Sequence, residues 1–201
     1  MRTCLLSWCL FAVSAALSAA QTLTDAEVQT ALAIGQAKQT RSVTTACLAA
    51  GGMGEVGYLV TLASNTGRIA LQAERAQKNY EPYGLAQVTF DLRLPAVYVT
   101  VDPQDPQRRS ASYATAQPIT RVVLKSKADP AQVVPPATFG LEDVSWGNGF
   151  GGTFSGTRAV ARFDAAAVHA LKGDVDVAVV TPTGERRCKI AAKEWLKVVP
   201  Q

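Results

Sequence analysis

Histidine is almost absent from this chain, which has one, His169, among its 201 residues. Most catalytic zinc centres use several imidazole ligands, and a serine triad needs a histidine beside an acid and a serine. No G-x-S-x-G motif is present to supply that serine. The sequence therefore predicts no metal site, no cofactor and no catalytic residue, and His169 is expected to be structural.

Long apolar runs are also scarce, and the one at the N-terminus has a specific pattern. A positive charge precedes a mostly apolar run over residues 5–17, and small side chains then lead up to Ala20. This order is typical of a secretory signal peptide with cleavage after Ala20. We therefore expect residues 1–20 to be a signal peptide and residues 21–201 to be exported to the periplasm, the cell surface or the medium. No other stretch approaches the roughly 20 apolar residues that cross a bilayer, so no transmembrane segment is expected.

Cysteine is the third scarce residue, and two of the four, Cys4 and Cys9, lie within the predicted leader. Export to an oxidising compartment favours a disulfide between the remaining pair, Cys47 and Cys188. In the chain-entropy model, closing so long a loop stabilises the fold by at most about 5 kcal/mol. The alternative is a reactive thiol at Cys47 with His169 as its base, but the apolar sequence around Cys47 favours the disulfide.

Neither sign of charge dominates the sequence. Charged residues make up 18% of the chain, and its net charge is +4. The only local excess of cations, within 186–197, is diluted by Glu185 and Glu194. Nucleic-acid-binding proteins usually concentrate their positive charge on one face, so no nucleic-acid partner is expected.

What is present begins with a well-marked helix directly after the leader. Thr24 and Glu27 form a capping box, in which each side chain bonds a free backbone N–H of the other residue. A narrow apolar stripe follows at helical spacing: Val28, Ala31, Leu32 and Gly35. We expect this stripe to pack against a sheet.

The remainder of the chain alternates between helical and extended patterns. A turn at 65–67 and a second helix at 68–79 are predicted, and Asp164 and Gly173 bracket a short helix at 164–172. Alternating residues predict strands at 58–63, 96–101, 119–127, 137–144 and 157–163, and a hairpin from 176–181 and 186–191, while 44–50 suits a short strand or a helix end. Together these elements predict an α+β fold: a β-rich, sandwich-like single domain.

One glycine-rich segment carries three aromatic residues, Trp146, Phe150 and Phe154. Its glycines match G-x-G-x-x-G, but a β-like segment follows where a dinucleotide site needs a helix. Aromatic side chains on an exposed loop suit contact with a protein or glycan partner. The alternative is a bend whose aromatic side chains fold back into the core.

The carboxylates form no recognisable catalytic or calcium-binding motif. Asp102 shares a predicted loop with Asp105, and neighbouring Glu142 and Asp143 would point to opposite faces of an extended segment. None of the acidic pairs has EF-hand spacing. We expect these side chains to be solvated surface charges, although the fold could still bring two carboxylates together as in a glycosidase.

These observations favour a non-enzymatic, exported binding or interaction protein at the cell envelope, with an unidentified protein or glycan partner. One alternative is a self-associating structural subunit of an extracellular surface assembly, which would use exposed edge strands. The other is a small extracytoplasmic hydrolase that uses carboxylates alone.

One mass measurement tests both the leader and the disulfide. The intact mass of the exported protein should correspond to a chain that begins at Gln21, and it should rise by the mass of two hydrogen atoms on reduction. Retention of residues 5–17 would contradict cleavage after Ala20. Alkylation of Cys47 and Cys188 without prior reduction would contradict the disulfide.

Overall fold

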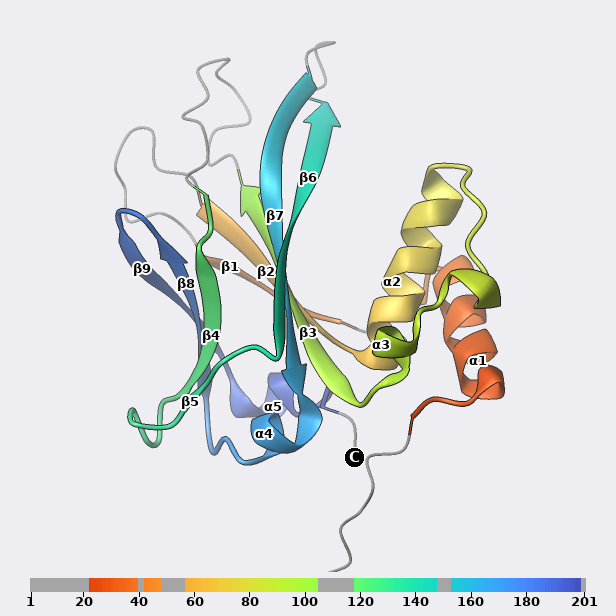
Figure 1. Cartoon of the computed structure of the whole chain (residues 1–201). Coiled ribbons are helices and arrows are strands. Elements are labelled where there is room, and N and C mark those ends of the chain that lie inside the picture. The colour runs from red at the N-terminus through yellow and green to blue at the C-terminus, as the bar shows by residue number, and fades with distance from the viewer. Residues whose placement is uncertain (1–21, 40–41, 48–56, 105–117, 148–152, 200–201) are drawn as a thin grey trace, which may run out of the picture.

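The computed structural model describes residues 22–39, 42–47, 57–104, 118–147 and 153–199. Within these ranges the chain forms two antiparallel sheets and five α-helices (Figure 1). The predicted α+β composition, rich in strand, is confirmed.

The larger sheet has five strands in the order β1-β2-β3-β7-β6. Its strands are β1 (Val43–Cys47), β2 (Gly57–Ser64), β3 (Ala96–Gln104), β7 (Thr153–Asp164) and β6 (Thr138–Gly147). All neighbouring strands pair antiparallel, and β6 and β7 form a long hairpin whose far end extends beyond the rest of the sheet in Figure 1. Segment 44–50, which suits either a short strand or a helix end by its sequence, begins within strand β1.

The smaller sheet has four strands in the order β5-β4-β8-β9. These are β5 (Val133–Val134), β4 (Arg121–Ser126), β8 (Val175–Thr181) and β9 (Gly184–Ile190). The predicted hairpin is confirmed, with a turn tighter than expected: Thr181 pairs with Gly184, which leaves two residues between the strands. Gly184 has φ +145°, a backbone conformation that side chains rarely adopt, so glycine suits this position.

Side chains from both sheets contribute to one large apolar cluster. Val60 of β2 and Val99 of β3 belong to it together with Val122 of β4 and Val177 of β8, and all four are completely buried. We call the face of the five-stranded sheet that carries Val60 and Val99 the inner face. Since side chains alternate along a strand, Thr61 and Thr100 lie on the opposite, outer face.

The C-terminal tail packs against this cluster. Trp195 is the last residue of the short helix α5 (Ala192–Trp195) and is 2% exposed. Its indole N–H donates to the carbonyl oxygen of Gly173 over 2.9 Å. Val198 and Val199 are also buried in the cluster. A buried indole with its N–H satisfied fixes the end of the chain without leaving a polar group unpaired.

Helices α1 (Asp25–Gln36) and α2 (Asn65–Lys78) pack against each other beside the outer face (Figure 1). The capping box at Thr24 is confirmed, and the four stripe residues are the buried ones of α1. The stripe meets α2, however, so the expectation that it packs on a sheet is wrong. Val28 and Leu32 form a second, smaller apolar cluster with Ile69 of α2.

The second helix begins earlier than predicted, at the residues expected to form a turn. The Ser64 side chain accepts a hydrogen bond from the backbone N–H of Gly67 over 3.0 Å, and this N-cap places Asn65, Thr66 and Gly67 in the first helical turn. The predicted end is close to the observed one, at Lys78. The local Asn-Thr-Gly composition resembled a turn, but the preceding serine decides the conformation.

Three further helical segments are short: η1 (Leu85–Gln87) and α3 (Phe90–Arg93) lie between α2 and β3, and α4 (Ala165–His169) lies between β7 and β8. Helix α4 is shorter than the predicted 164–172, and Asp164 is its N-cap residue but makes no capping hydrogen bond through its side chain. Gly173 has φ +71°, so glycine is favoured there, although the helix has already ended.

The predicted disulfide is compatible with the arrangement of the strands. Cys47 is the last residue of β1, and Cys188 lies in β9, which is close to β1. Cys188 is 3% exposed and has an interaction partner in the structure. The pairing of Cys47 with Cys188 stays a prediction.

In the described part of the chain, no helix combines the length and apolar character that crossing a membrane requires.

The contact between α1 and α2 depends on the absence of a side chain at Gly35. A Cβ atom there would overlap the carbonyl oxygen of Ala70 and lie 2.8 Å from Cβ of Ala73. Gly35→Ala should therefore lower the free energy of unfolding by about 2 kcal/mol, although alanine normally stabilises a helix relative to glycine. Urea denaturation measures the change.

Gly140→Ala in β6 is the matched control, because nothing lies within 4 Å of the Cβ it would add. Its stability should change by less than about 0.5 kcal/mol. If Gly35→Ala were as stable as the wild type, the close approach of the two helices would be refuted.

Candidate functional site

Helix α2 has two different faces, and the polar one points toward the five-stranded sheet. Ile69, Ala73 and Ala76 are buried on the apolar face, of which Ile69 and Ala73 join the cluster shared with α1. Arg68 and Arg75 are spaced seven residues apart, two helical turns, and so lie on one side of the helix. Packing the apolar face against α1 therefore directs a row of polar side chains over the outer face of the sheet.

A cavity of about 240 Å³ lies between this polar side of α2 and strands β2 and β3. The helix contributes Arg68, Leu71, Gln72, Glu74, Arg75 and Lys78, followed by Asn79, and the strands contribute Thr61, Thr100 and Asp102. We call this cavity the α2 cleft. It is smaller than the 300–1,000 Å³ typical of sites for drug-sized ligands, so it fits a small molecule or one end of a larger one.

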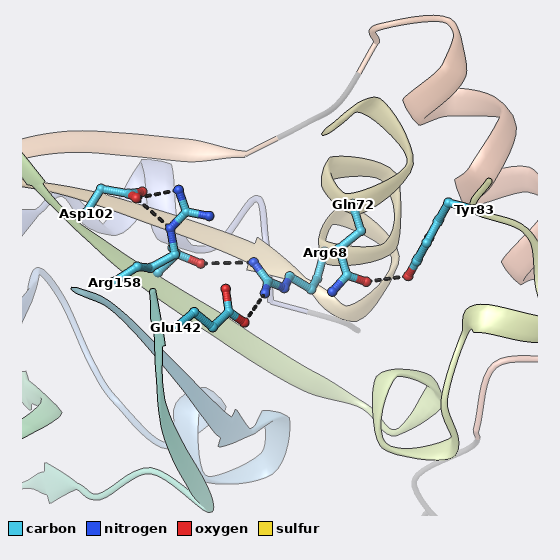
Figure 2. Close-up of polar contacts among 7 residues, drawn as sticks. Arg68, Gln72, Tyr83, Asp102, Glu142 and Arg158 are labelled. Carbon is cyan, nitrogen blue, oxygen red and sulfur yellow. Dashed lines mark hydrogen bonds and ion pairs between the residues drawn. The ribbon is translucent and has the colours of Figure 1, made fainter. Parts of the chain in front are cut away.

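Arg68 is the central cation of the α2 cleft, and its side chain is only 8% exposed. Its Nη1 donates to the Thr100 hydroxyl over 3.3 Å, and its Nη2 donates to Oε1 of Glu142 over 3.4 Å (Figure 2). Burial lowers the pKa of the Arg68 guanidinium, Glu142 raises it, and the positive charge of Arg75 lowers it. Both bonds are long for hydrogen bonds from a charged donor.

Asp102 forms a much tighter ion pair with Arg158 of β7. Its Oδ1 accepts from Nε of Arg158 and lies against Nη2, both over 2.5 Å. Burial raises the pKa of the Asp102 carboxyl, and the positive charges of Arg75 and Arg68 lower it. The third nitrogen of Arg158, Nη1, is buried and has no hydrogen-bond partner among the described residues.

The expectation that Asp102 is a solvated charge in a loop is therefore wrong. Strand β3 continues through Asp102, which pairs with Leu59 of β2, instead of ending there. Because Asp102 follows Tyr98 and Thr100 at alternate positions, it lies on the outer face beneath α2. Its side chain is 22% exposed.

Strand pairing brings a second carboxylate into the same network. Glu142 of β6 is the register partner of Arg158 and is bonded to Arg68, so Arg158 lies between Asp102 and Glu142 across three strands (Figure 2). The Glu142 side chain is 46% exposed. The network therefore runs from the buried floor of the cleft to solvent.

Tyrosine and lysine side chains hold the helix side of the cleft in place. The Tyr83 hydroxyl donates to Oε1 of Gln72, and Lys78 forms an ion pair with Glu74 over 2.8 Å. Burial raises the pKa of Tyr83, and the charge of Arg68 lowers it. Tyr83 also packs against the cluster of α1 and α2, so the same residue connects that core with the cleft.

The α2 cleft presents both charged and neutral polar side chains to its interior. Asp102, Glu142 and Glu74 are each paired with a cation of the protein: Arg158, Arg68 and Lys78, respectively. His169 lies on α4 and does not line the cleft. Among the described residues, no three potential ligands gather that could hold a metal ion.

Two of the three aromatic residues predicted to bind a partner, Trp146 and Phe154, lie on the β6–β7 hairpin. Trp146 and Phe154 are register partners at the far end of the β6–β7 hairpin. Phe150 lies outside the described residues. The hairpin places the two positions directly opposite each other, and their role in binding stays a prediction.

Sequence reasoning did not find the cleft, although two local signals were present. Arg68, Gln72 and Arg75 recur at helical spacing beside the apolar stripe of the same helix. Asp102 continues the alternation of Tyr98 and Thr100 along β3. Each pattern by itself is also typical of an ordinary solvent-exposed face of a helix or strand. Arg158 reaches Asp102 only because β3 pairs with β7.

Asp102→Asn tests the ion pair beneath the cleft. Removing one partner of a largely buried ion pair leaves the charge of the other partner uncompensated. Because the Asp102 side chain is partly exposed, we expect only a moderate loss, about 2 kcal/mol in the free energy of unfolding. The double variant Asp102→Leu with Arg158→Met removes both charges and should recover most of this loss in urea denaturation.

Glu194→Gln provides the control, because Glu194 pairs with Lys197 over 2.7 Å on the exposed surface. We expect it to cost less than about 0.5 kcal/mol. Equal losses of stability for Glu194→Gln and Asp102→Asn would show that the Asp102–Arg158 pair stabilises the fold no more than an exposed ion pair does.

Comparison of the chain with protein-family models, with curated proteins and with solved structures finds no match, so the geometry of the α2 cleft itself is the basis for a function.

Proposed function

We propose that this chain is an exported, non-enzymatic binding protein that holds a small polar ligand in the α2 cleft. The observation that carries the proposal is the cleft itself, about 240 Å³ in volume, with polar groups on both its helix wall and its sheet wall. Small-molecule sites are typically preformed concave surfaces in which a few fixed polar groups orient the ligand.

The rigidity of both walls supports this proposal. Thr100 and Asp102 lie on the central strand β3, which is paired on both sides. The opposite wall, α2, is held by its apolar cluster with α1. Binding groups on rigid elements lose little conformational entropy when the ligand arrives. We also propose that the two sheets pack as a sandwich, supported by the apolar cluster to which both contribute.

The hydrolase alternative receives less support. Its expected signature is a pocket with two carboxylates of raised pKa, and the cleft is lined by one carboxyl with a raised pKa, that of Asp102. That carboxyl is bonded to Arg158. A general acid must reach the substrate with its proton, whereas Asp102 is engaged in an ion pair with the protein's own guanidinium group.

The structural-subunit alternative has one observation in its favour. β6 ends the five-stranded sheet, and Phe139 and Leu141 on it are 36% and 49% exposed. Against it, Glu142 and Asp143 lie in the middle of β6, and antiparallel pairing of two such strands would bring like charges together. Concentration-dependent assembly in analytical ultracentrifugation would nevertheless favour the subunit.

The proposal is tested by filling the cleft from the sheet side. Saturation-transfer NMR is recorded with glucose, N-acetylglucosamine, glutamate, lysine and citrate as separate probes. At least one probe should bind, and Thr61→Tyr should abolish its signal because Thr61 lines the cleft. Leu71→Trp fills the same space from the helix side and should have the same effect.

Arg121→Tyr introduces the same new side chain at an exposed position of β4 and should leave binding intact. Melting temperatures of all three variants verify folding. Failure of every probe to bind, or binding that survives both cleft-filling substitutions, would refute the α2 cleft as the ligand site.

A further inference from the structure

The guanidinium group of Arg68 has more hydrogen-bonding capacity than the protein uses. A guanidinium carries five N–H donors, and the described residues provide two acceptors for this one, at 3.3 and 3.4 Å. Hydrogen bonds from a charged donor are normally about 2.7–2.9 Å long. Arg158 bonds to the Asp102 carboxylate over 2.5 Å, so the long hydrogen bonds are specific to Arg68. A buried cation held this weakly is a strong donor for an incoming acceptor.

The charges around the cleft also leave an excess of positive charge. Lys78 pairs with Glu74, and Arg158 pairs with Asp102. The side chain of Arg75, which lines the cleft, forms no hydrogen bond or ion pair with any residue in the described part of the chain. Its positive charge lowers the pKa of Arg68, because two like charges on the same side of α2 repel each other. Arg68 has a distant partner in Glu142, at 3.4 Å, whereas Arg75 has none among the described residues, so a bound anion would relieve the repulsion and offset the charge of Arg75.

We infer that the α2 cleft binds an acidic small molecule, whose carboxylate or phosphate oxygens are bound between Arg68 and Arg75. This inference rests on the proposed function and names the class of ligand. Guanidinium groups match the planar fork of a carboxylate and the oxygens of a phosphate, and two of them on one side of α2 can hold one oxyanion from two directions.

The remaining lining residues suit the rest of such a ligand. Thr61, Thr100 and Asn79 present hydroxyl and amide groups to the cleft. These neutral groups both donate and accept hydrogen bonds, so they complement ligand hydroxyls without adding charge. The small volume of the cleft favours a compact acid over a polymer.

Isothermal titration calorimetry with citrate and, separately, with inorganic phosphate tests the inference. Glucose serves as the neutral control. Binding of either anion should weaken about tenfold in Arg75→Gln, which removes one charged donor without disturbing a bonded partner. Arg68→Lys keeps the positive charge but loses the fork, and should weaken binding at least as much while the protein remains folded by circular dichroism.

Arg121→Gln, an exposed arginine on β4, is the matched control and should leave the affinity unchanged. Citrate binding without phosphate binding identifies a carboxylate as the ligand group, and the reverse result identifies a phosphate. An equal loss in Arg121→Gln and Arg75→Gln would overturn the inference, because attraction would then reflect net charge alone.

The result also separates this inference from the proposed function. If neither anion binds while a neutral probe binds and is excluded by Thr61→Tyr, the acidic-ligand inference fails and the α2 cleft remains a binding site. If Thr61→Tyr changes the binding of no probe, charged or neutral, both the acidic-ligand inference and the proposed function fail.

Discussion

Burial of one guanidinium group, that of Arg68, between a helix and a sheet is the constraint on which the architecture of the site depends. A buried cation must have acceptors, and these come from two strands: Thr100 on β3 and Glu142 on β6. The outer face of the sheet is consequently polar at the place where α2 covers it. Because this contact supplies little apolar burial, α2 needs a separate apolar partner on its other side.

That partner is α1, and the two helices form a core of their own beside the sheet. Gly35 allows the backbone of α2 to approach closely, and Val28, Leu32 and Ile69 bury the apolar surface. The fold thus has one large apolar cluster on the inner face and a smaller one between the helices. Between them lies a polar layer that contains the α2 cleft. A polar layer between two apolar clusters is well suited to binding, because its charged groups are held in place from both sides.

Much of the fold could be predicted from the sequence, but the candidate site could not. The capping box at Thr24, the helix ending at Lys78 and the β8–β9 hairpin follow from local patterns that need no knowledge of the partner segment. The site needs Arg68 and Asp102 to meet Arg158, and these residues come from segments far apart in sequence. Antiparallel pairing of β3 with β7 brings them together. Asp102 and the proline that follows it look like the start of a loop, although strand β3 continues past both residues.

The central claim is that Arg68 and Arg75 form the anion-binding part of the α2 cleft, and side-chain NMR of the arginines tests it most directly. Nε–Hε signals of the labelled protein are followed while citrate is added. Saturable shifts with a common affinity are expected for Arg68 and Arg75, and no shift is expected for Arg121. Unchanged Arg68 and Arg75 signals at saturating citrate, or equal shifts at all three arginines, would contradict the claim.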